Sequence, residues 1–212
     1  MVEATPEAAV LVAWFRHHIL WQPPGNSLKQ ILTEQQVNEG VRRLADEINA
    51  FYHARPLTIV GVLTGSVVLM ADLIRLLQMP LKIGVVQATS YRGLATVPGE
   101  LHMNFDLLPE ITGRNILIVD DIFDTGQTLC ALVEEFAARE PAQLRTAVLL
   151  RKAGRVQVSM QPDHVGFEIP DEFVVGYGLD FADLYRNLPY VAALEAEDIA
   201  AARGGKTHAG RT

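Results

Sequence analysis

The sequence predicts an α/β fold in which a twisted parallel sheet is flanked by helices. Short aliphatic runs at residues 57–63, 81–89, 116–119 and 144–150 have the length and composition of buried strands. Segments with helical spacing of apolar residues lie between several of these runs, so strands and helices alternate. The chain has 212 residues, of which 49% are hydrophobic and 20% charged, which suffices for one globular domain with a full core.

Residues 1–28 are predicted to form a helical extension that precedes the domain. Residues 8–15 are apolar, but glutamates rather than lysines come before them, no small-residue cleavage pattern follows, and Arg16 interrupts the run. The segment therefore resembles neither a signal peptide nor a membrane span, and we expect it to dock on the domain or on another subunit. A Pro-Pro-Gly-Asn-Ser cluster at 23–27 separates it from the domain.

The first helix of the domain is expected to begin after Thr33, because Thr33 and Gln36 have the spacing of a capping box. Its apolar stripe comprises Val37, Val41, Leu44, Ile48 and Phe51. The strand at 57–63 follows and ends in Thr64-Gly65-Ser66, after which apolar residues recur with helical spacing at Met70, Leu73, Ile74 and Leu77. A tight turn before a helix offers backbone N–H donors to an anion.

The most informative stretch, residues 115–128, reads Asn-Ile-Leu-Ile-Val-Asp-Asp-Ile-Phe-Asp-Thr-Gly-Gln-Thr. The strand at 116–119 puts Asp120 and Asp121 at its carboxyl end, the edge where open α/β sheets bind ligands. Residues 124–128 then lead into a helix with apolar residues Leu129, Leu132, Val133 and Phe136. This loop brings a glycine, two hydroxyls and unpaired N–H groups to a helix N-terminus, which predicts a phosphate site.

Three carboxylates beside a phosphate site need another role. Asp120, Asp121 and Asp124 could bind ribose hydroxyls, hold Mg²⁺ or take a proton, or they could simply form a polar strand end and a helix cap. The spacing Asp-Asp-x-x-Asp also occurs in prenyl-chain synthases, but there it lies within a helix of an all-helical protein. The strand before this motif and the Thr-Gly after it argue against that class.

Two further segments are expected at the same edge of the sheet. Ser90-Tyr91-Arg92-Gly93 begins a loop of about twenty residues, and loops of this length are usually functional lids or disordered. Within it, residues 100–106 alternate well enough to form a short hairpin strand. The strand at 144–150 ends in Arg151-Lys152, which places Lys152 beside the same ligand edge.

Residues 115–128 resemble the phosphoribosyl-diphosphate (PRPP) loop of the type I phosphoribosyltransferases. Residues 165–190, which include Val-Gly-Phe-Glu-Ile-Pro-Asp-Glu-Phe-Val-Val-Gly-Tyr-Gly-Leu-Asp-Phe, are similar to the hypoxanthine-guanine branch of that family. The resemblance covers roughly 31–190. It implies the type I phosphoribosyltransferase fold, with a small hood, for a domain at 29–195. The Gly-rich residues 196–212 are expected to form a flexible tail.

The resemblance implies Mg²⁺-dependent purine salvage, in which PRPP and hypoxanthine or guanine give IMP or GMP and pyrophosphate. Asp124 would be the general base that accepts the purine N7 proton, and Lys152 would donate to the 6-oxo group, so that adenine is disfavoured. The remaining implied contacts are Thr125, Gly126, Gln127 and Thr128 for the 5′-phosphate, Asp120 and Asp121 for ribose and Mg²⁺, Asp180 for Mg²⁺ and the base, Thr64, Gly65 and Arg186 for pyrophosphate, Phe173 and Val174 for the base, and Ser90 and Tyr91 for a mobile loop. Many members have Lys or Arg where this chain has Thr64, so one positive contact to pyrophosphate is missing.

Composition restricts the partners and the compartment. The 25 acidic and 18 basic residues give a net charge of −7, so no global basic surface for nucleic acid is expected, and no segment is expected in a membrane. The single cysteine, Cys130, excludes an internal disulfide, suits a reducing cytoplasm and is expected to be buried in its helix. Family members form homodimers or homotetramers. Two alternatives stay open: a transferase for xanthine or another base, and a non-catalytic PRPP or nucleotide sensor that binds RNA.

Overall fold

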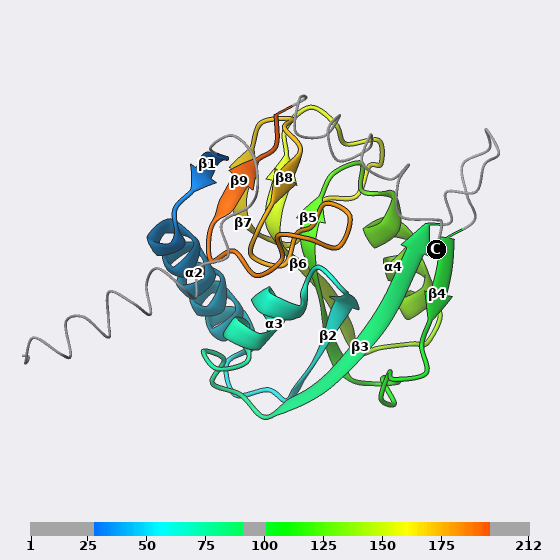
Figure 1. Ribbon diagram of the computed structural model, residues 1–212. Coiled ribbons are helices and arrows are strands. Elements are labelled where there is room, and N and C mark those ends of the chain that lie inside the picture. Colours follow the sequence, from blue (N-terminus) through cyan, green and yellow to red (C-terminus); the bar gives the residue numbers. More distant parts are fainter. Residues whose placement is uncertain (1–27, 91–100, 196–212) are drawn as a thin grey trace, which may run out of the picture.

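The structure, a computed structural model, describes residues 28–90 and 101–195 and confirms the α/β architecture (Figure 1). Its main sheet, as far as the chain is described, has the strand order β4-β3-β2-β5-β6-β7, with β4 antiparallel to β3 and the other neighbours parallel. The strands are β2 (Leu57–Leu63), β3 (Leu81–Ser90), β4 (Leu101–Asn104), β5 (Asn115–Phe123), β6 (Gln143–Lys152) and β7 (His164–Ile169). The predicted hairpin strand within 100–106 is therefore β4.

Strand β5 is longer than the sequence predicted. Its pairing with β6 continues past the aliphatic run, with Asp120 opposite Val148 and Phe123 opposite Arg151. Asp120 and Asp121 consequently lie inside the last part of the strand rather than after it. The prediction ended the strand too early because charged residues are rare in a buried strand. The hydrogen bonds between β5 and β6 are made by the backbone, so the pairing continues through the two aspartates at the ligand edge.

Helices cover both faces of the sheet. On one face, α2 (Glu34–Tyr52) and α3 (Val67–Leu73) pack on alternate strand residues that include Ile59, Leu117 and Leu149. On the other face, α4 (Gln127–Ala137) packs on the intervening residues, among them Val60, Ile118 and Val148. The period-2 alternation of each strand thus builds two cores, one on each side of the sheet.

The capping box at the start of α2 is confirmed. The Thr33 hydroxyl accepts from the Gln36 N–H at 3.2 Å, and the Gln36 side chain accepts from the Thr33 N–H at 2.8 Å. The predicted stripe is right except at its end, where Phe51 is half-buried and Tyr52 is fully buried. Tyr52 follows Ile48 by four residues, so it continues the row that faces the sheet.

A second, smaller sheet forms the predicted hood. Its strands β1 (Lys29–Leu32), β8 (Val174–Val175) and β9 (Val191–Ala193) are antiparallel in the order β1-β9-β8. It joins the two ends of the described domain beside the main sheet (Figure 1). The predicted tail at 196–212, all but the last residue of the predicted extension at 1–28, and Tyr91 of the predicted mobile loop lie outside the described residues.

Cys130 is less buried than the sequence predicted. Cys130 on α4 is half-buried rather than buried, and its partial burial together with the neighbouring Glu134 raises the pKa of its thiol. The expectation of full burial is wrong because residue 130 lies beside, and not within, the row of Leu129, Leu132 and Phe136 that faces the sheet.

None of the helices in the described ranges is both long and apolar enough to cross a membrane.

Candidate active site

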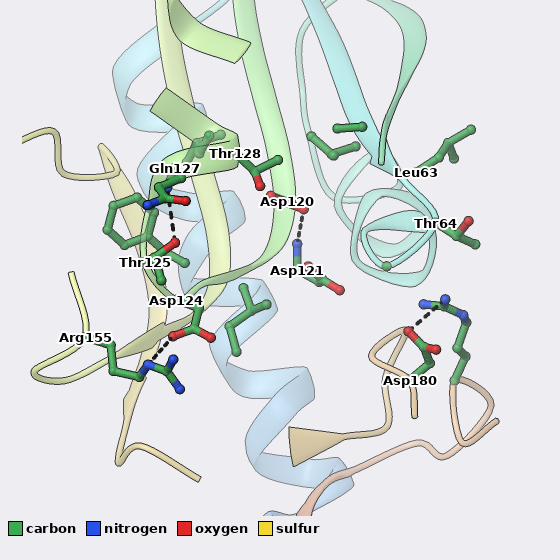
Figure 2. A pocket seen from close by; sticks show the side chains of 18 residues that line it. Leu63, Thr64, Asp120, Asp121, Asp124, Thr125, Gln127, Thr128, Arg155 and Asp180 are labelled. Atoms are coloured by element: carbon green, nitrogen blue, oxygen red, sulfur yellow. Dashed lines mark hydrogen bonds and ion pairs between the residues drawn. The ribbon is translucent and has the colours of Figure 1, made fainter. Parts of the chain in front are cut away.

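A cavity of about 530 Å³ opens at the carboxyl ends of β2 and β5 (Figure 2). Its wall is formed by the turn after β2, by the end of β5 and the start of α4, and by residues from two later loops. The members of the wall that the sequence analysis singled out are Thr64, Gly65, Asp120, Asp121, Asp124, Thr125, Gly126, Gln127, Thr128, Asp180 and Arg186. The fold therefore brings into one cavity residues that lie as far apart in the chain as Thr64 and Arg186.

The loop before α4 has the geometry of an anion site. Gly126 has φ +85°, and a Cβ there would lie 2.5 Å from Val158 and 2.6 Å from the Phe123 ring, so that only glycine fits. Gly126 has no side chain with which to cap α4, which begins at Gln127, and the Gln127 N–H makes a long bond of 3.4 Å to the Thr125 hydroxyl. The next N–H groups of the first turn and the positive end of the helix dipole lie at the cavity wall, where they can bind a phosphate.

Asp120 and Asp121 form an acidic pair at the bottom of the cavity. Burial raises the pKa of Asp120 well above its ordinary value, and the neighbouring charge of Asp121 raises it further. Burial also raises the pKa of Asp121, although hydrogen bonds and Arg186 oppose the change. A Cβ on Gly65 would lie only 1.7 Å from Asp121 Oδ2, so the carboxylate packs directly on the turn after β2.

Asp124 lies between two cations. Its Oδ1 is 3.1 Å from Arg155 Nε, and its Oδ2 is 3.5 Å from Lys152 Nζ. Lys152 is the last residue of β6 and is almost fully buried, whereas Arg155 comes from the following loop and lines the cavity. The hydrogen bond that Arg155 donates to Asp171 and the charges of Asp124 and Asp171 raise the pKa of Arg155.

Asp180 and Arg186 form the opposite wall. Their side chains are 2.8 Å apart, and Arg186 Nη1 also donates to the Gly178 carbonyl at 2.8 Å. Figure 2 shows Asp124 with Arg155 on one side of the cavity, Asp180 on the other, and Asp120 and Asp121 between them. This separation leaves the centre of the cavity open for a ligand.

The three predicted magnesium ligands do not form a closed cage. No group of three or more His, Cys, Asp or Glu side chains in the described residues is arranged to hold a metal, and Asp180 is engaged by Arg186. Mg²⁺ usually retains several waters and is bound through one or two carboxylates together with substrate phosphates. The buried pair Asp120 and Asp121, whose charged form lacks solvation, fits that mode, and Asp180 in the wall of the same cavity stays a predicted ligand.

Of the predicted base-binding residues, Asp180 lies in the cavity wall, whereas Lys152, Phe173 and Val174 are not among the residues that line it. Val174 is buried in β8 of the small sheet, and Phe173 precedes it with 43% of its surface exposed. The Phe173 ring packs edge-on against Phe181, with 5.5 Å between centroids, so that a ring face is left available for stacking. Ser90 of the predicted mobile loop is the last residue of β3.

Comparison with known proteins decides the family. A sequence profile described as "Phosphoribosyl transferase domain" matches residues 27–182. A hypoxanthine-guanine phosphoribosyltransferase of Staphylococcus epidermidis is 41% identical over 167 residues, which are 79% of this chain and 93% of that protein. The chain belongs to the phosphoribosyltransferase family. A Staphylococcus aureus hypoxanthine-guanine phosphoribosyltransferase is 39% identical over 173 residues, 81% of this chain and 97% of that protein.

Solved structures of other phosphoribosyltransferases share the fold. A Bacillus anthracis hypoxanthine-guanine phosphoribosyltransferase has a TM-score of 0.72 and 38% identity and covers 79% of this chain and 98% of its own. A Trypanosoma cruzi hypoxanthine phosphoribosyltransferase has a TM-score of 0.77 and 34% identity over 86% of this chain and 100% of its own.

The sequence analysis missed two residues near the site of this phosphoribosyltransferase. Arg155 contacts Asp124 directly, and Asp171 contacts both Arg155 and Lys152. Arg155 stands in no motif, and both residues come from irregular segments that flank β7. The only signal was the position of Arg155 shortly after Lys152. Asp171 gave no signal, although it lies within the stretch that resembles the family.

Proposed function

We propose that this phosphoribosyltransferase transfers the phosphoribosyl group of PRPP to N9 of hypoxanthine or guanine, forming IMP or GMP and pyrophosphate. The observation that carries the proposal is the 3.5 Å contact between Asp124 and Lys152 beside the anion loop. N7 and the 6-oxo group are neighbours on one edge of these purines. A carboxylate and an ammonium at this spacing match that edge, since one can take the N7 proton and the other can donate to the oxygen.

The other residues of the cavity supply the positioning and the charge that this reaction needs. The 5′-phosphate binds at residues 125–128, and Asp120 and Asp121 hold the ribose hydroxyls. As the C1–O bond breaks, negative charge develops on the departing pyrophosphate, and Arg186 and the turn at Thr64 and Gly65 stabilise it. Asp120 and Asp121 would also hold Mg²⁺, which would supply further positive charge for the departing pyrophosphate. A metal or base contact for Asp180 stays a prediction.

The general-base role of Asp124 is tested by Asp124→Asn. The amide cannot accept the N7 proton, so we expect the turnover number to fall by about 10²–10⁴. The affinity for IMP, measured by titration calorimetry, is expected to change far less because the phosphate loop stays intact. Glu172→Gln serves as the control, since Glu172 pairs with Lys29 of β1 and lies outside the cavity wall. An unchanged turnover number would remove Asp124 from this role.

The reaction itself is tested by an absorbance assay with PRPP, Mg²⁺ and each of hypoxanthine, guanine, xanthine and adenine. We expect nucleotide formation with the first two and none with adenine, because the Lys152 ammonium cannot accept a hydrogen bond from an amino group. Activity with xanthine alone would favour the alternative base. Failure with every base, together with tight PRPP or nucleotide binding and a gel shift with structured RNA, would favour the sensor. The homodimer or homotetramer and the cytoplasmic location stay predictions.

A further inference from the structure

Four charged side chains beside the cavity form a closed ring of ion pairs. Asp124 contacts Arg155 at 3.1 Å and Lys152 at 3.5 Å. Asp171 contacts the same two cations, with Oδ1 at 3.2 Å from Arg155 Nη1 and at 3.6 Å from Lys152 Nζ. The proposed function uses Asp124 and Lys152 and assigns no role to Arg155 or Asp171.

The ring creates a difficulty for Asp124 as a proton acceptor. A cation lies beside each of its carboxylate oxygens, so a proton on Asp124 leaves both cations without the charge of this partner. Once Asp124 has taken the N7 proton, Lys152 also loses the charge of one partner. Only 7% of the Lys152 side chain is exposed, so water cannot replace that partner.

We propose that Asp171 is a positioning residue that compensates Lys152 and Arg155 when Asp124 takes the proton. The proposal rests on the proposed function. The ring is neutral with both carboxylates charged, and it carries one positive charge after the proton transfer. Without the charge of Asp171, the ring would carry one positive charge before the proton transfer and two after it. The negative charge of Asp171 therefore lowers the electrostatic cost of moving a proton to Asp124, and it keeps Lys152 in place beside the 6-oxo group.

Asp171→Asn tests this role. Asp171 and Arg155 are 51% and 43% exposed, so solvent screening limits the effect, and we expect the turnover number to fall by roughly two- to fivefold. The KM for PRPP is expected to stay unchanged, because residues 125–128 are not in the ring. Asp171→Glu, which keeps the charge, is expected to recover most of the loss. Glu172→Gln is the matched control, since the neighbouring Glu172 pairs with Lys29 at 2.9 Å and not with the ring.

A second variant separates this role from a merely structural one. Arg155→Gln in the Asp171→Asn background removes one positive charge and makes the ring neutral again. We expect the double variant to recover at least half of the wild-type turnover, whereas a folding defect would not be repaired by the loss of a second side chain. A double variant as slow as Asp171→Asn, or a single variant with unchanged turnover, would overturn the proposal.

The outcome for Asp124→Asn separates this inference from the function on which it rests. If Asp124→Asn abolishes turnover while Asp171→Asn leaves it unchanged, only the role of Asp171 is wrong. If Asp124→Asn keeps full turnover, the general base itself is misassigned and the role of Asp171 is overturned with it.

Discussion

The carboxylates of Asp120 and Asp121 lie where binding and stability make opposite demands. Both are withdrawn from water, Asp120 to 8% exposure, and they are adjacent in the chain. Burial and, for Asp120, the neighbouring charge raise their pKa values. The pKa of each carboxyl is therefore higher in the folded protein than in the unfolded chain. Below the unfolded pKa both states are protonated, and the pair costs no stability. As the pH rises through the folded pKa, the free energy of unfolding falls, because the unfolded chain ionises more readily than the folded pair.

Asp120→Asn is therefore expected to stabilise the ligand-free protein while it impairs catalysis. In EDTA at pH 7 we expect Tm to rise by about 2–4 °C, equivalent to ~1 kcal/mol for a domain of this size. The gain in Tm should vanish as the pH falls below 3.8, the ordinary pKa of an aspartate, because the Asp120 carboxyl is then as neutral as the amide that replaces it. Asp183→Asn, at a side chain that is 93% exposed, is the control and should leave Tm unchanged. A lower Tm for Asp120→Asn would contradict this account.

At the scale of the element, α2 depends on its two ends. The capping box fixes where the helix begins, and Tyr52 anchors its last turn on the sheet, where the hydroxyl donates to the Ile116 carbonyl at 3.3 Å. Together they orient the apolar row of α2 toward the core beneath the sheet.

Loss of the cap should be measurable without a change in the core. Thr33→Ala removes the acceptor for the Gln36 N–H, and we expect a loss of ~1 kcal/mol of unfolding free energy. Thr33→Ser keeps the hydroxyl and is expected to retain most of the stability. Urea denaturation of the three proteins is the measurement, and equal midpoints for wild type and Thr33→Ala would show that the cap contributes nothing.

The other end of α2 predicts a pH effect. Burial raises the pKa of Tyr52 to about 12, from an ordinary value of 10.0. Its contribution to stability is therefore complete below pH 10 and is lost as the pH rises toward 12, because only the unfolded chain ionises in this window. Relative to Tyr52→Phe, wild type should lose about 1 kcal/mol between pH 9 and 11. A constant difference between the two proteins across this range would contradict the prediction.

At the scale of the whole molecule, the segment between β8 and β9 of the small sheet is tied to the main domain around the cavity. The Tyr177 hydroxyl donates to Asp72 of α3 at 2.5 Å, and Arg186 holds the Gly178 carbonyl. Gly178 also lies against the Gly65 carbonyl of the turn after β2. The residues proposed for the base and those proposed for pyrophosphate are thus held by one set of contacts.

Tyr177→Phe should loosen this connection. Hydrogen bonds to charged groups contribute about 1.5–3 kcal/mol, but Asp72 is 26% exposed and also pairs with Arg75, so we expect a loss near the lower limit. The KM for hypoxanthine should rise more than the KM for PRPP, because β8 and Phe173 belong to the loosened part. Asp72→Asn and the double variant complete a cycle. Additive losses in the cycle would show that the two side chains are not coupled.

The sequence by itself determined the strands β2 to β6, the helices α2 to α4 and the loop before α4. Each of these depends on residues that are neighbours along the chain, since periodicity, the capping box at Thr33 and the need for glycine at 126 follow from local backbone geometry. Local patterns failed where a position depended on its surroundings, as for the length of β5, for Phe51 and for Cys130.

Only the tertiary structure decided which charges meet. The ring of Asp124, Lys152, Arg155 and Asp171 and the packing of Asp121 on Gly65 join segments that are separate in the sequence. The pairing of Asp180 with Arg186 joins two residues of the segment between β8 and β9. The sheet register and the path of the loops after β6 and β7 set these distances, and no local pattern encodes them. Electrostatic interaction depends on separation in space and on burial, and the folded chain alone fixes both.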